Sequence, residues 1–140
     1  MKSVSLMKLG GKDCIVVFKI KDNVVHVIPS DPNDPNINIY SRPSDSNYLI
    51  KHNRSGLILN FHFTKLKDGW LCSVSREADL KHIEYNDNLA FKINSKRDIY
   101  VTLNILHDES FRTDVCDLSW GHNKDEKYEI LGLSDLYFEV

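Results

Sequence analysis

The stretch LILNFHFTKLKDGWLCSVS, residues 57–75, contains two runs of alternating side chains separated by a short polar turn. Apolar residues occupy every second position from Leu57 to Phe63, and again from Trp70 to Val74. A period of two places such side chains on one face of a β-strand. The Lys-Asp-Gly turn suits a hairpin, because glycine readily adopts positive φ. These residues therefore predict a β-hairpin with one apolar face.

The same rhythm recurs along the whole chain, with turns at intervals of roughly 8 to 12 residues. Clear examples are CIVVFKI (14–20), LAFKI (89–93) and IYVTLNIL (99–106). The connections are short and rich in Gly, Asn and Asp, as hairpin loops require. The predicted fold is all-β: a single antiparallel β-sandwich or barrel-like domain over residues 1–140, built from sequential hairpins, with at most one or two short helices.

One segment, SREADLKHIEY at residues 75–85, has the features of a short helix. Ser75 can cap the amino terminus, Glu77 and Lys81 form an i,i+4 pair, and Leu80 and Ile83 share a side. A helix is therefore expected here.

Alternation also predicts which side chains are buried. The expected core consists of Val16, Phe18, Leu59, Phe61, Phe63, Val74, Phe91, Val101, Leu103 and Ile105. Polar residues on the opposite faces are expected to meet water, and these are Asn60, His62, Lys92, Thr102 and Asn104. Trp70 directly follows a hairpin turn and is expected in the core.

Composition limits the classes of partner. In 140 residues, 41% are hydrophobic, and 18 basic and 20 acidic residues give a net charge of -2. This balance offers no broad attraction to phosphate backbones or anionic membranes, so nucleic acid is not a predicted partner. The longest apolar run, CIVVF, is too short to span a bilayer. A soluble cytoplasmic protein without a membrane segment is expected, and the sequence leaves the oligomeric state open.

The chain carries few signs of a metal, a cofactor or a nucleophile. Its three cysteines, Cys14, Cys72 and Cys116, are widely spaced, and each alternates with apolar neighbours, which indicates buried, inert thiols. The six histidines show no metal-binding spacing. No phosphate-binding or dinucleotide motif is present. No catalytic residue, metal ligand or cofactor is therefore predicted, and enzymatic activity is not favoured.

The repeated Asp-Pro-Asn in PSDPNDPNINIY, residues 29–40, allows two interpretations. Ser30, Asp31, Asn33, Asp34 and Asn36 supply the oxygen donors that calcium prefers. Each proline, however, also presets a turn, and each following asparagine tolerates the next turn position. The sequence favours two successive turns, and a calcium loop remains the alternative.

Two charged segments flank the apolar run TDVCDLSW, residues 113–120, and are the predicted partner-binding regions. An aromatic anchor beside a charged rim is the usual arrangement of a protein-binding hot spot. The first segment contains His107, Asp108 and Glu109, and the second contains Trp120, His122, Lys124, Asp125 and Glu126. They leave opposite ends of one expected strand, so only one is expected in the main interface. The second is preferred, although Trp120 could instead cap the core.

The sequence as a whole predicts a non-catalytic binding module that recognises a macromolecule, most plausibly a protein, as inhibitors, immunity proteins and adaptors do. Charge-dense loops on a rigid sheet suit this role. One alternative is a calcium-assisted sandwich that binds carbohydrate or lipid. Another is a metal-dependent hydrolase or nuclease, since Asp79-Leu80-Lys81 and Asp125-Glu126-Lys127 each match half of a nuclease motif.

Overall fold

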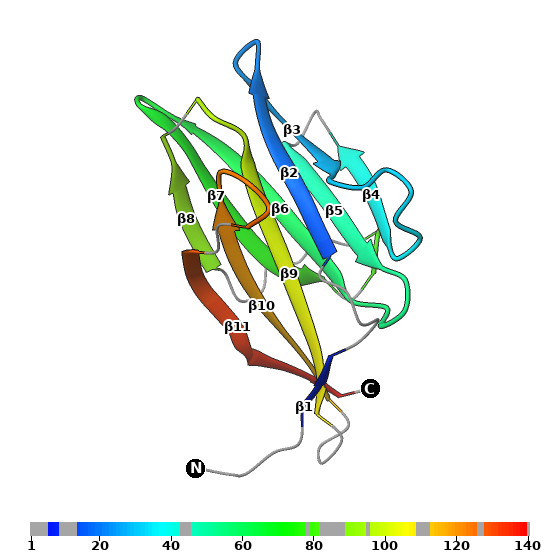
Figure 1. The fold of residues 1–140 in the computed structure, drawn as a ribbon. Helices are drawn as coiled ribbons and strands as arrows, with labels where there is room; N and C mark the ends of the chain where they lie inside the picture. The colour runs from blue at the N-terminus through cyan, green and yellow to red at the C-terminus, as the bar shows by residue number, and fades with distance from the viewer. Residues whose placement is uncertain are drawn as a thin grey trace.

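The computed structural model describes residues 6–8, 14–42, 46–77, 79–81, 89–94, 96–108, 113–125 and 128–139. Every regular element in these ranges is a β-strand, and the strands form two antiparallel sheets packed face to face (Figure 1). Neither sheet closes on itself in the part of the chain that is described. The predicted all-β fold is therefore confirmed, and it is a sandwich rather than a barrel.

Within the described residues, sheet A has six strands and sheet B has five. Sheet A contains β1 (Leu6–Lys8), β2 (Cys14–Lys21), β3 (Val24–Pro29), β9 (Ile99–Asp108), β10 (Thr113–Gly121) and β11 (Tyr128–Glu139), in the order β11-β10-β9-β2-β3 with β1 also paired to β9. Sheet B contains β4 (Ile37–Arg42), β5 (Asn47–His52), β6 (Ile58–Leu66), β7 (Gly69–Glu77) and β8 (Leu89–Ile93), in sequential order. Sequential hairpins build sheet B and the β2–β3 and β9–β10–β11 parts of sheet A, which the pairing of β2 with β9 joins. The chain changes sheet after β3 and after β8.

The core lies between the sheets and is centred on aromatic rings. Phe18 of β2 is fully buried, and its ring centroid lies 5.4 Å from that of Phe61 and 5.1 Å from that of Phe63, both on β6. These edge-on contacts join sheet A to sheet B. Burial is confirmed for the expected core residues Val16, Phe18, Leu59, Phe61, Phe63, Val74, Val101 and Leu103. Phe91 is half-buried against this core, and the side chain of Ile105 lies outside the described part.

One of the three cysteines can be placed. Cys72 of β7 is fully buried in the core, and burial raises the pKa of its thiol well above the ordinary value. A thiol in this state is a poor nucleophile, as the sequence predicts. The side chains of Cys14 and Cys116 lie outside the described part of the chain.

The expectation that the outer faces meet water is wrong for Asn60 and Thr102 and correct for Lys92. Asn60 on sheet B is fully buried, and Thr102 on sheet A is 4% exposed. His62 is half-buried, Lys92 is exposed, and the side chain of Asn104 is not described. Asn60 Nδ2 donates to Asn47 Oδ1 at 3.2 Å, and this cross-strand bond lowers the cost of burying both amides. Alternation identifies the residues that share a face, but not whether that face is covered.

The helix expected at residues 75–85 is not formed where the structure describes this segment. Ser75 to Glu77 are the last three residues of β7, and residues 79–81 form a bend. Ser75 pairs with Asn60 of β6, and its Oγ donates to Glu77 Oε1 at 2.8 Å instead of capping a helix. Pairing along a long hairpin thus prevails over local helix signals. Residues 78 and 82–85 lie outside the described part.

No helix long and apolar enough to cross a membrane occurs among the described residues.

Tyr48 of β5, in sheet B, forms a hydrogen bond to β3, the edge strand of sheet A. Its hydroxyl donates a 2.6 Å hydrogen bond to the backbone carbonyl of Val25 on β3. Desolvation by burial raises the pKa of the Tyr48 phenol, and a hydrogen bond with the Ser41 side chain partly offsets this. The neutral phenol is therefore the form that the folded protein favours.

Removing this hydroxyl tests the link. Tyr48→Phe is expected to lower the free energy of unfolding by about 1–2 kcal/mol, because the Val25 carbonyl loses its partner. Since the folded pKa lies above the unfolded value near 10.0, ionisation favours unfolding as the pH rises above that value. The stability that Tyr48 adds should therefore shrink above about pH 10. Urea denaturation of both proteins at pH 7 and pH 10.5 measures this, and a pH-independent difference would contradict it.

The Asp-Pro-Asn repeat forms two successive turns, as the sequence favours. Asp34 N donates to the Asp31 carbonyl at 3.1 Å, which closes the first turn over Pro32. The Asp31 and Asp34 carboxylates each accept from the backbone amide two residues later, at 2.9 Å in both cases. Asn53, in the turn between β5 and β6, is bonded to this loop: its Nδ2 donates to the Pro35 carbonyl at 2.7 Å. Each repeat thus uses its carboxylate to stabilise its own turn.

The effect of substituting Asp31 and Asp34 on stability should depend on whether the acceptor oxygens of their side chains are kept. The double variant Asp31→Asn/Asp34→Asn keeps both acceptor oxygens and is expected to change the free energy of unfolding by less than about 0.5 kcal/mol. Asp31→Ala/Asp34→Ala removes them and should cost about 1–2 kcal/mol in total. Thermal unfolding with calcium or EDTA provides the readout. The turn interpretation fails if calcium raises the melting temperature of the natural protein but not that of the Asn variant.

Candidate binding surface at one end of the sandwich

Loops from both sheets converge at one end of the sandwich, which we call the hairpin end: residues 19–23, 65–70, 92–98 and 120–125, except Ser95, which lies outside the described part (Figure 1). The β2–β3 turn is tight because Asp22 and Asn23 adopt positive φ of 53° and 61°. The β6–β7 turn ends at Gly69, whose φ is 146°. Strand β1 lies at the opposite end (Figure 1).

A hollow of about 480 Å³ lies between the first three of these loops. Its buried and half-buried lining consists of Gly69 and of Ile20, Trp70 and Ile93, whose side chains form an apolar floor. Its exposed lining includes Lys65, Lys67 and Lys96, together with Asp22 and Asp68. The volume falls within the range of roughly 300–1,000 Å³ that is typical of ligand pockets. The hollow is therefore an apolar recess with a charged rim.

Trp70 is the largest side chain in the hollow, and it is half-buried rather than a full core residue. It is the cross-strand partner of Lys65, and Lys65 Nζ lies 4.9 Å from the centroid of its ring. This cation–π contact holds a positive charge beside the aromatic face. The β6–β7 hairpin thus presents an apolar surface and a cation together.

An ion pair fixes the β6–β7 turn to β8. Lys92 Nζ lies 2.8 Å from Asp68 Oδ2. The hydrogen bond from Lys92, and secondarily its charge, lower the pKa of the Asp68 carboxyl. Asp68 therefore links this turn to Lys92 of β8.

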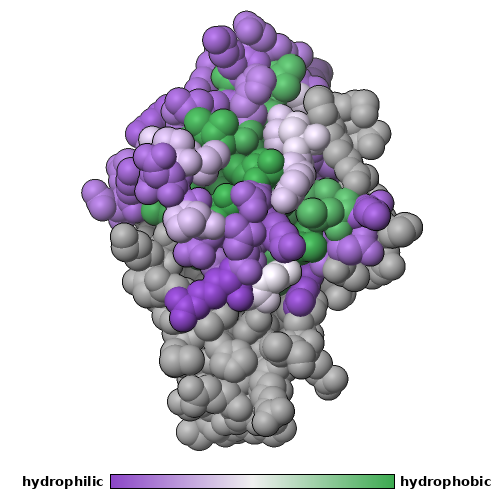
Figure 2. All heavy atoms as spheres, turned by 90° about the vertical axis from the view of Figure 1, so that its right-hand side faces the viewer, coloured by the Kyte–Doolittle hydropathy of each residue, from purple (hydrophilic) through white to green (hydrophobic). Residues whose placement is uncertain are grey.

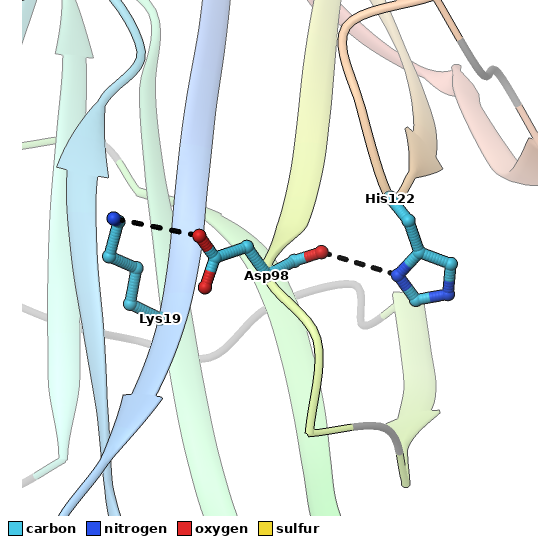
Figure 3. Close-up of polar contacts among 3 residues, drawn as sticks. All are labelled: Lys19, Asp98 and His122. Carbon is cyan, nitrogen blue, oxygen red and sulfur yellow. Dashed lines mark hydrogen bonds and ion pairs between the residues drawn. The ribbon is translucent and has the colours of Figure 1, made fainter.

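Asp98 connects three strands on the sheet A side of the hairpin end, as Figure 3 shows. Its carboxylate lies 3.5 Å from Lys19 Nζ on β2, and its backbone carbonyl lies 3.2 Å from His122 Nδ1, just after β10. A carbonyl can only accept, so Nδ1 carries the proton in this contact. The start of β9 is thus tied to both neighbouring strands.

Trp120 packs against the core at the end of β10 and is half-buried. Its ring meets that of His122 edge-on, with centroids 5.7 Å apart. A small cavity of about 60 Å³ separates these rings from Phe91 and Ile93. Trp120 therefore contributes at least part of its ring to the core, which was the alternative that the sequence left open. Its role in binding a partner stays a prediction.

The other predicted partner-binding residues divide between the two ends of the sandwich. Lys124 and Asp125 are exposed in the turn after β10, where the Asp125 amide donates to Asn123 Oδ1 at 2.8 Å. His107 and Asp108 lie at the far end of β9, opposite Asp114 and Thr113, and their side chains are not described. Glu109 and Glu126 lie outside the described part. The structure thus groups Trp120, His122, Lys124 and Asp125, and separates them from His107 and Asp108.

A different face, formed by the edge strands β3 and β4, also exposes apolar groups, and Figure 2 shows them among polar ones. The largest are Val24, Ile28 and Tyr40, at 47%, 41% and 42% exposure. The free edge of β3 is poorly suited to pairing with another strand. Pro29 offers no N–H, and the Val25 carbonyl already accepts from Tyr48. We therefore prefer the hairpin end as the candidate site.

The hollow itself was missed by the sequence analysis. Lys65 and Trp70 flank the Lys-Asp-Gly turn, so hairpin pairing alone could have placed them together. Asp22 and Lys96 come from loops far apart in the chain, and no local pattern indicates that they meet. Comparison with known proteins adds no further assignment: no family model matches, and no curated protein or solved structure shows significant similarity.

Proposed function

We propose that the chain is a non-catalytic binding module that recognises a protein partner through the hairpin end. The observation that carries this proposal is the hollow between the loops of both sheets, with Trp70 in its apolar floor and lysines on its rim. Aromatic side chains in recesses, surrounded by charged residues, are typical of protein-binding hot spots. Rigid sheets also hold binding loops in place without further ordering.

The polar contacts of the hollow favour binding over catalysis. Asp68 is paired with Lys92, and Lys65 lies against Trp70, so both serve to fix the surface. Lys124 and Asp125, exposed after β10, add further charged groups at the hairpin end. The proposed setting is the cytoplasm, in an inhibitor, immunity or adaptor role.

The calcium-assisted and metal-dependent alternatives gain no support from local geometry. The carboxylates of Asp31 and Asp34 accept from amides of their own turns. Asp79, in one of the half-matches to a nuclease motif, accepts from the Lys81 amide at 2.7 Å in the same way. These contacts explain the residues as turn formers.

Affinity capture from an extract of the native host tests the proposal. The bait is compared with Lys67→Glu/Lys96→Glu at the hairpin end and with the control Lys51→Glu/Arg54→Glu, which makes the same change of charge away from it. A specific protein should bind the natural bait and the control, and be lost from the first variant. Equal capture by all three baits would refute the proposed surface, and thermal unfolding must show each variant folded.

A further inference from the structure

The charge of the hairpin end differs from that of the whole molecule. Its described residues contain eight lysines and arginines against four aspartates, whereas the entire chain has a net charge of -2. The remainder of the chain is therefore strongly acidic in balance. Such an asymmetry creates a local positive potential that attracts anionic groups.

Two of these four aspartates are already matched by cations. Asp68 lies 2.8 Å from Lys92, and Asp98 lies 3.5 Å from Lys19. Lys67 on the β6–β7 loop and Lys96 on the β8–β9 loop are exposed at the rim, and Ile20 and Ile93 line the recess. The hollow thus combines an apolar floor with positive charge from two loops.

We infer that the hollow binds an acidic segment of a protein partner, in which an apolar or aromatic side chain enters the recess and flanking carboxylates meet Lys67 and Lys96. This inference rests on the proposed function, because it takes the partner to be a protein. The side chain would contact Ile20, Trp70 and Ile93, which removes apolar surface from water. Carboxylates at the rim would set specificity and speed the encounter.

A protein segment fits this surface better than a nucleic acid does. Non-specific binding of single strands uses a groove of cations with several stacking aromatics. Here the hollow contains one tryptophan, so it offers no series of rings on which successive bases could stack. In the apolar floor, the aliphatic side chains of Ile20 and Ile93 favour an apolar side chain over a base.

The probe for this inference is the synthetic peptide acetyl-Glu-Asp-Phe-Asp-Glu-amide, added to the full-length protein. The chain has two tryptophans, Trp70 and Trp120, and Trp120→Phe serves only to assign the Trp70 indole N–H signal in NMR spectra. Binding is then measured on the natural protein, where the peptide should shift the Trp70 indole signal saturably. Replacing its phenylalanine by alanine should weaken binding by about tenfold, and Lys67→Glu/Lys96→Glu should weaken it by about tenfold or more.

The following controls distinguish specific binding of the peptide in the hollow from general electrostatic attraction of anions. Lys51→Glu/Arg54→Glu should leave peptide affinity unchanged, and a peptide with lysine at the four acidic positions should not bind. A heparin fragment and oligothymidine serve as competing polyanions. Tighter binding of either polyanion, without dependence on the peptide's phenylalanine, would overturn the inference in favour of a general anion surface. Absence of any saturable shift in the Trp70 signals would also overturn it.

Failure of this inference and failure of the proposed function give different results. If a captured partner depends on Lys67 and Lys96 but the peptide does not bind, the protein-binding function stands and the acidic-segment chemistry is wrong. If the peptide binds the hollow as described but no captured protein depends on these lysines, the hollow recognises acidic ligands and the proposed function is wrong.

Discussion

Phe18→Ala is expected to lower the free energy of unfolding by about 3–5 kcal/mol, among the largest effects of any single truncation in this chain. Phe18 is fully buried, and its ring reaches three others across the sandwich, those of Phe61, Phe63 and Phe91. Removal of the ring leaves a cavity between the two sheets. The aromatic contacts that join β2 to β6 and β8 would be lost with it.

Urea denaturation measures this loss, with Val24→Ala as the matched control. Val24 lies on the neighbouring strand but is 47% exposed, so its truncation should cost less than about 0.5 kcal/mol. The loss of unfolding free energy in Phe18→Leu should fall between those of Phe18→Ala and Val24→Ala. Phe18→Leu should also remain folded if Phe18→Ala does not. A loss below about 1 kcal/mol for Phe18→Ala would show that the two sheets do not pack through this ring.

Gly69→Ala should lower the free energy of unfolding by about 2–4 kcal/mol and disturb the hollow. A Cβ at this position would lie 2.2 Å from the Ile93 carbonyl oxygen and 3.1 Å from the Asn94 Cα. Both are backbone atoms, so no rotation of a side chain relieves the contact. The φ of 146° is also unfavourable for any residue with a Cβ. Strands β7 and β8 would have to separate where they line the hollow.

Gly56→Ala provides the comparison for this prediction. Gly56 has a φ of 78°, but no heavy atom lies within 4 Å of a Cβ built there. Its substitution should therefore cost only the backbone strain, about 1–2 kcal/mol. Thermal unfolding of both variants, with the Trp70 indole N–H signal in NMR spectra as a local readout, checks the difference. Equal losses, with no change at Trp70 in Gly69→Ala, would contradict the close approach of β7 and β8.

Much of the fold could be predicted from local patterns. Alternation in residues 57–75 identified the β6–β7 hairpin and its buried face, because burial of one face imposes a period of two. The turn at Asp22 and Asn23 was also predictable, since these residue types tolerate positive φ. Such features depend on neighbours in the sequence, which is why they could be found without the structure.

Features that depend on distant parts of the chain were not predictable. Ser75 carries a helix-capping signal, yet its pairing with Asn60 keeps it in a strand. Asn60 is fully buried on the face expected to meet water, and alternation holds no information on coverage. The hollow arises where three loops meet, so Trp70 was expected in the core and its lysine neighbours were not recognised. The sequence predicted Trp120 and His122 as partner-binding residues. The structure places them at the hairpin end, which also contains the hollow.

Backbone amide chemical shifts of the isotope-labelled protein, recorded with and without its captured partner, test the location of the binding surface most directly. The proposal predicts that the largest changes occur at residues 20–23, 65–70, 92–98 and 120–125, with the Trp70 indole among them. Changes confined to residues 31–36 and 53–55, around the Asp-Pro-Asn turns, would contradict it, because those loops lie away from the hairpin end (Figure 1).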